Sequence, residues 1–91
     1  MSPPASQGAR KLLAYFIDAA QASKHCFVAG PVWNQLDRVV AGETQYLRYA
    51  FDGVDSREVP FSTADLEKYG LGDARIEVAL EYKIAALLGK Q

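Results

Sequence analysis

The chain has 91 residues, with 10 Lys and Arg, 11 Asp and Glu, and a formal net charge of −1 at pH 7. This length is that of one domain, and 49% hydrophobic with 23% charged residues is a globular composition that excludes an intrinsically disordered chain. The near-zero charge provides no bulk attraction to nucleic acid or to anionic membranes, and the single cysteine, Cys26, excludes an internal disulfide scaffold.

The N-terminal part predicts a lead-in followed by an amphipathic helix. Residues 1–8 are rich in Pro, Ser and Gly, which is typical of a flexible segment, so residues 9–91 are expected to form the single domain. From about residue 9 to residue 23 the apolar side chains share one helical stripe, which consists of Leu12, Leu13, Phe16, Ile17 and Ala20. Asp18 interrupts the apolar run, and no run approaches the roughly 18–20 residues of a membrane span, so we expect a cytoplasmic protein.

The middle of the chain predicts two more helices and one short strand. Pro31 suits the first turn of a helix over residues 31–40, because its missing N–H would have no partner there. A third helix is predicted over residues 45–51. The apolar faces of these two helices are formed by Val32, Leu36, Val39 and Val40, and by Tyr46, Leu47, Ala50 and Phe51. Residues 58–61 predict one brief strand, which Pro60 confines to the edge of a sheet.

The C-terminal third predicts two helices joined by a tight turn. Ser62 and Asp65 match a capping box that starts a short helix, residues 62–70. Gly70 is expected to end this helix in the left-handed conformation, before the last helix over residues 73–88. The predicted fold is therefore mainly α, or all-α, with a helix-turn-helix layout, an extra N-terminal helix and at most one short strand.

The joints between these elements carry a pattern of apolar, glycine and serine residues. Its positions are Phe27, Gly30, Pro31 and Val32; Gly42; Val59, Phe61 and Ser62; Leu66, Tyr69 and Gly70; and Ala79 and Leu80. In this order the pattern resembles that of small, mostly uncharacterised bacterial winged helix-turn-helix proteins. The resemblance implies a winged-helix domain that is truncated here, because a β-hairpin wing follows the last helix in that family. It also implies a DNA-binding, transcription-regulatory protein that acts as a dimer.

The resemblance makes the last helix the recognition helix, whose first turns meet base edges in the major groove. Arg75 is then the expected base contact, because its guanidinium can donate two hydrogen bonds to guanine. The candidate phosphate contacts are Thr63, Lys68 and Lys83.

An acidic row on the same helix argues against contact with DNA. Asp73, Glu77 and Glu81 recur at intervals of four residues and so share one helical row, where phosphates would repel them. The alternative interpretation is a solvated face that never meets DNA, because exposed rows of charge are commonly no more than that.

An apolar strip on the last helix predicts a protein contact. Apolar residues cover more of this helix than one core-facing stripe needs. The predicted interface residues, for a homodimer or for another protein partner, are Tyr82, Ala86 and Val78. The alternative function is therefore a protein–protein interaction module, an adaptor or inhibitor on a winged-helix-like scaffold that does not bind DNA.

The sequence predicts neither an enzyme nor a cofactor or metal site. His25 and Cys26 are adjacent in an extended segment, so their side chains point to opposite faces, and Cys26 is expected to be a small buried residue. One Cys and one His are too few ligands for a usual zinc site. The glycines form no nucleotide-binding pattern. No catalytic residue is therefore assigned.

Overall fold

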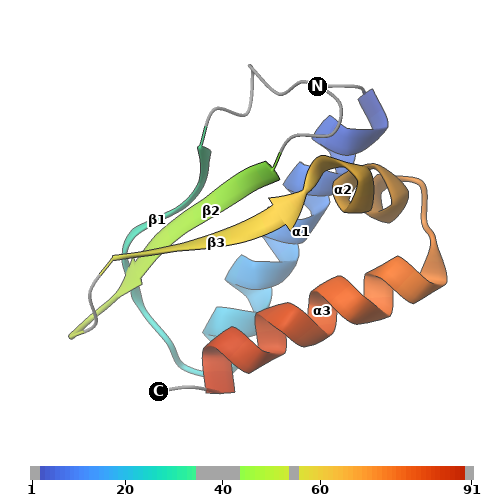
Figure 1. Ribbon diagram of the computed structural model, residues 1–91. Helices are drawn as coiled ribbons and strands as arrows, with labels where there is room; N and C mark the ends of the chain where they lie inside the picture. Colours follow the sequence, from blue (N-terminus) through green and yellow to red (C-terminus); the bar gives the residue numbers. More distant parts are fainter. Residues whose placement is uncertain (1–2, 35–43, 54–55, 90–91) are drawn as a thin grey trace.

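A computed structural model describes residues 3–34, 44–53 and 56–89 of the chain. In chain order its elements are α1 (Pro3–Ala22), β1 (Phe27–Asn34), β2 (Thr44–Phe51), β3 (Arg57–Ser62), α2 (Thr63–Gly70) and α3 (Ala74–Gly89) (Figure 1). The strands form one antiparallel sheet in the order β1-β2-β3, with α1 and α3 packed against its inner face. Within these ranges, no helix has the length and apolar character needed to cross a membrane.

The three-stranded sheet makes this an α+β fold, so the prediction of a mainly α or all-α domain with at most one short strand is wrong. The segment predicted as a helix over residues 45–51 lies in β2, where exposed and buried side chains alternate from Thr44 to Tyr49 and Ala50 and Phe51 are both buried. Gln45, Leu47, Tyr49 and Phe51 are buried, whereas Thr44, Tyr46 and Arg48 are exposed. The predicted helical stripe shares Leu47 and Phe51 with this buried set, because a run this short has residues that satisfy both periods. The segment is a strand because its backbone pairs with β1 on one side and with β3 on the other.

The other misassigned segment begins at Pro31, which lies inside β1 rather than in the first turn of a helix. Residues 35–40 of that predicted helix, and the predicted break at Gly42, lie outside the described residues. A proline is tolerated in β1 because β1 is an edge strand, whose outer side needs no ladder donor. Pro60 lies in β3, the opposite edge of the sheet, as the sequence predicted.

Aromatic rings join α1 to the inner face of the sheet. Leu12, Phe16 and Ala20, from the predicted stripe, are fully buried. The Phe16 ring meets the ring of Tyr49 edge-on at 5.0 Å between centroids, a geometry that favours aromatic pairs. At the other end of β1, the indole nitrogen of Trp33 donates a hydrogen bond of 2.8 Å to the Ala9 carbonyl. The core therefore forms between α1 and the sheet, and α3 closes it with Leu80, Ile84 and Leu88.

Helix α1 begins at Pro3, so most of the predicted lead-in, residues 1–8, is helical. Proline is favoured in the first turn of a helix. Because α1 starts this early, Gly8 lies within the helix, where it contacts Gly70 of α2. A Cβ at Gly8 would lie 1.8 Å from the Leu66 carbonyl oxygen, and one at Gly70 would lie 2.0 Å from the Pro4 carbonyl oxygen. The two helices thus cross with their backbones in contact, which only glycine permits.

The end of α2 also differs from the prediction. Gly70 is helical, and the left-handed residue is Gly72, with φ of +85°. The Leu71 N–H still bonds to the Glu67 carbonyl at 3.0 Å, and the Asp73 N–H bonds to the Lys68 carbonyl at 3.0 Å. The chain therefore reverses two residues later than expected, because Gly70 serves the helix crossing and not the cap.

We predict that Gly70→Ala destabilises the protein by about 3 kcal/mol or more, because the added methyl group can fit only if α1 and α2 separate. Chemical denaturation followed by circular dichroism would measure the change. The control is Gly89→Ala at the end of α3, where a Cβ meets nothing within 4 Å. There we expect a change between zero and about 1 kcal/mol toward higher stability. Equal stability of the two variants would contradict the crossing.

Candidate functional site

The segment from Ser62 to α3 contains the two capped helices and the short turn that the sequence predicted. The Ser62 hydroxyl accepts a hydrogen bond of 3.0 Å from the Asp65 N–H at the start of α2. One carboxylate oxygen of Asp73 accepts from the N–H groups of Arg75 and Ile76, at 3.0 and 3.3 Å, at the start of α3. Asp73 is therefore the N-cap of α3, where its charge also suits the positive end of the helix dipole.

The other two carboxylates of the predicted acidic row face the neighbouring helices. Glu77 forms an ion pair with Lys11 of α1. Glu81 accepts a hydrogen bond of 3.0 Å from the Tyr69 hydroxyl of α2. The Lys11 ammonium also lies 4.5 Å from the centre of the Tyr69 ring. We call Lys11, Tyr69, Glu77 and Glu81 the polar seam. Glu77 and Glu81 therefore join α3 to α1 and α2, in addition to any contact that they make with solvent.

Tyr69 is the buried member of the polar seam, with 1% of its surface exposed. Burial raises the pKa of its phenol well above the usual value, and the hydrogen bond to Glu81 raises that pKa further. The negative charges of Glu81 and Glu77 act in the same direction. The phenol is therefore held protonated, as a donor that positions Glu81.

The structure separates the four predicted DNA contacts into two groups. Thr63 is buried, with 4% of its surface exposed, and so cannot reach a phosphate without a rearrangement. The Lys83 ammonium lies 4.3 Å from the centre of the Phe61 ring and donates to the Pro60 carbonyl. Burial lowers the pKa of Lys83, and the charge of Asp65 partly opposes that shift.

Lys68 and Arg75 form the second group, because both side chains are exposed. They lie on either side of the turn between α2 and α3. Of the four predicted contacts, these two are available to a partner in the described structure.

The outward side of α3 is almost uncharged. We call it the α3 outer face, and its exposed residues are Ala74, Arg75, Val78, Ala79, Tyr82, Ala85, Ala86 and Gly89. Val78 and Tyr82 are 70% and 77% exposed. The three predicted interface residues, Tyr82, Ala86 and Val78, all belong to this face. Arg75 is its one charged residue, whereas the outward side of a surface helix usually carries most of the charges of that helix.

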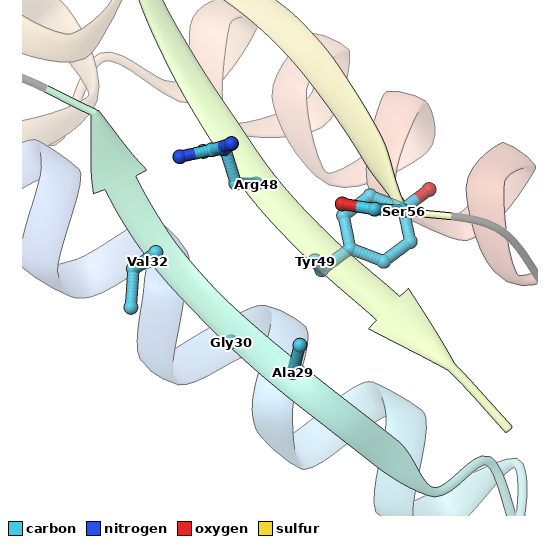
Figure 2. Close-up of a pocket in the computed structure, with 6 residues that line it drawn as sticks. All are labelled: Ala29, Gly30, Val32, Arg48, Tyr49 and Ser56. Atoms are coloured by element: carbon cyan, nitrogen blue, oxygen red, sulfur yellow. The ribbon is translucent and has the colours of Figure 1, made fainter.

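A pocket of about 230 Å³ lies between β1 and β2 (Figure 2). Its lining consists of Ala29, Gly30, Val32, Arg48, Tyr49 and Ser56. The Arg48 guanidinium is 3.6 Å from a Glu58 carboxylate oxygen, in an exposed pair worth at most about 1 kcal/mol. The volume is below the roughly 300–1,000 Å³ of ligand pockets, so the α3 outer face is the stronger candidate site.

His25 is partly buried, whereas the adjacent Cys26 is exposed. The imidazole packs against the Phe51 ring at 4.9 Å between centroids, and its buried Nδ1 has no hydrogen-bond partner among the described residues. Cys26 is exposed, contrary to the prediction of a buried residue, because it lies in the connection before β1. In the described ranges, no three or more His, Cys, Asp and Glu residues are grouped as metal ligands.

Sequence reasoning missed two residues that shape this site, Gly8 and Lys11. A glycine within a helical pattern was a usable signal for the close crossing, because glycine costs stability there unless packing requires it. The pairing of Lys11 with Glu77 had no such signal, because the partners are 66 residues apart and meet only through the crossing of α1 and α2.

Comparison of the chain with known protein families, curated proteins and solved structures gave no match. The resemblance to winged helix-turn-helix proteins, and the DNA binding that it implies, therefore stay predictions.

We predict that Tyr69→Phe reduces the loss of stability at alkaline pH. Folding raises the pKa of this phenol, so its contribution to the free energy of unfolding is complete below the pKa of the unfolded chain, about 10. That contribution is lost as the pH rises above this value. Above about pH 10 the natural chain should lose up to about 1.4 kcal/mol per pH unit more than the variant. Urea denaturation between about pH 8 and pH 11 measures both slopes. Equal slopes would show that Tyr69 ionises alike in both states.

Proposed function

We propose that this protein is a protein–protein interaction module that binds its partner through the α3 outer face. The observation that carries the proposal is the exposure of Val78 and Tyr82 on a helix side with Arg75 as its one charged residue. Exposed apolar side chains that lie together on one helix side favour a contact surface, since their burial removes apolar area from water.

The polar seam supports this proposal. Glu77 and Glu81 are turned toward α1 and α2, where they contact Lys11 and Tyr69. A helix that only had to remain in solution would direct these carboxylates outward. Here the charged groups stabilise the packing of α3 within the domain, and the outward side is left to small and apolar residues.

The composition of the α3 outer face suits a docking helix. Tyrosine is among the residues that contribute most to binding energy in protein interfaces, and Tyr82 is 77% exposed. Burying a side chain the size of Val78 contributes roughly 1.5–3 kcal/mol. The flanking alanines, Ala79, Ala85 and Ala86, allow a partner backbone to approach closely.

Duplex DNA is the second candidate partner. The observation that favours it is the exposure of Lys68 and Arg75 beside the turn between α2 and α3. Two cations are few for a DNA-binding domain, which usually gathers a larger basic patch. The other two predicted DNA contacts are engaged within the domain, since Thr63 is buried and Lys83 lies over the Phe61 ring.

The interaction proposal is tested with a photo-cross-linking amino acid in place of Ala79, in cells that produce the full chain. We expect a cross-linked protein adduct that decreases at least tenfold when Val78→Glu is added, because a buried unpaired carboxylate opposes docking. Val78 is 70% exposed, so Val78→Glu should change stability by no more than about 0.5 kcal/mol, which thermal denaturation checks.

The matched control places the same cross-linking residue at Ala14, an exposed alanine of α1. No Val78-dependent adduct should form there. Equal adducts at both positions, or adducts at Ala79 that are indifferent to Val78→Glu, would reject the α3 outer face as the docking site.

The DNA candidate is tested by binding to random-sequence duplex at low and moderate salt. If Lys68 and Arg75 contact phosphates, the affinity falls by about 0.9 log units per contact for each tenfold rise in salt, and Arg75→Glu abolishes binding. Lys24→Glu, in the turn after α1, is the control and leaves binding unchanged. Absence of binding at low salt, or equal effects of both variants, would reject DNA as the partner.

A further inference from the structure

We infer that the α3 outer face binds a second copy of this chain, with the two α3 helices antiparallel and the two Tyr82 side chains at the twofold axis. The inference rests on the proposed function, since it names the partner of the same face. Three properties of the face carry it: the positions of its residues, their sizes and the place of its charge.

The positions are symmetric about Tyr82. Six of the eight exposed residues of α3 form three pairs at equal distances on either side of it: Arg75 with Gly89, Val78 with Ala86, and Ala79 with Ala85. Tyr82 also lies at the middle of Ala74–Gly89, so an antiparallel pair centred on it overlaps along the whole helix. A twofold interface requires such self-complementarity, in which residue i meets residue j and j meets i.

The sizes favour the antiparallel direction. Tyr82 is the largest residue of the face, and its neighbours three and four positions away are Val78, Ala79, Ala85 and Ala86. In the antiparallel pair each phenol ring lies over the short side chains of the partner, so the backbones can approach. A parallel pair would set Arg75 opposite Arg75 and Gly89 opposite Gly89, which leaves a crowded end and an open end.

The charge also favours the antiparallel direction. Arg75 lies in the first turn of α3, and Gly89 is the last residue of the helix. Antiparallel packing places each guanidinium beside the C-terminal end of the partner helix, whose unpaired carbonyl groups carry about half a negative charge. In a parallel pair the two arginines would repel each other at the same end.

The size of the face predicts a reversible dimer. From Arg75 to Gly89 the face is about 21 Å long, at 1.5 Å per residue, and about 10 Å wide. A strip of these dimensions is small beside the about 800 Å² per partner of a standard interface. Dimerisation should therefore depend on concentration, and a covalent trap is the suitable measurement.

The test uses single-cysteine variants of the full chain in a Cys26→Ser background, with one chain of each mixture carrying a mass tag. Cys26 is exposed, and so are the three substituted positions. Under mild oxidation, Tyr82→Cys should form a disulfide-linked dimer with itself. Val78→Cys and Ala86→Cys should cross-link at least tenfold more in a mixture than either does alone. In the inferred dimer each of these residues is about 12 Å along the axis from its own copy, beyond the reach of a disulfide. Ala14→Cys on α1 is the control and should remain monomeric.

The outcomes separate the inference from the proposed function. Self-cross-linking of Val78→Cys and of Ala86→Cys that exceeds the mixed product would show a parallel pair and overturn the inference. A monomeric mass by light scattering at every concentration, with no disulfide at Tyr82→Cys, would also overturn it. The proposed function would stand in both cases if the adduct at Ala79 still depended on Val78. If neither the disulfide-linked dimer nor the Val78-dependent adduct at Ala79 forms, both the inference and the proposed function are rejected.

Discussion

The contact between α1 and α2 at Gly8 and Gly70 is the constraint on which the rest of the structure depends. A Cβ on either glycine would overlap a carbonyl oxygen of the other helix, so the two backbones touch. Lys11 lies one turn after Gly8, and Tyr69 is the residue before Gly70. The crossing therefore sets the Lys11 ammonium over the Tyr69 ring. It also fixes the direction in which α3 leaves the turn, since α3 starts only four residues after Gly70.

The polar seam and the α3 outer face are two consequences of that placement. Glu77 and Glu81 meet Lys11 and Tyr69 because α3 runs beside the crossing. With its carboxylates turned inward, α3 presents alanines, Val78 and Tyr82 to the outside. The orientation of α3 about its own axis thus provides both the contacts of Glu77 and Glu81 inside the domain and the exposed apolar side. This link between packing and surface is why the outer face is the candidate site, in preference to the small pocket between β1 and β2.

The helix patterns were predictable because they depend on local spacing. The stripe of Leu12, Phe16 and Ala20, the cap at Ser62 and the apolar strip with Tyr82 all follow from residues within a few turns of each other. The sheet was not predictable in this way. Residues 45–51 satisfy a helical and a strand period equally, and the partners that decide, Trp33 opposite Leu47 and Val59 opposite Leu47, lie in other parts of the chain. The helix predicted over residues 31–40 started from Pro31, whose place in an edge strand depends on the pairing of β1 with β2.

The sequence by itself determined the helices at the two ends of the chain, the edge position of Pro60, and an apolar strip on the last helix beyond what its core contact needs. Only the tertiary structure decided that the middle of the chain pairs as strands and that Gly70 serves a helix crossing and not a cap. It also decided that Glu77 and Glu81 contact Lys11 of α1 and Tyr69 of α2. The reason is the same in each case: an intrinsic preference acts over a few residues, whereas a strand pairing, a backbone contact or an ion pair joins residues far apart in the chain.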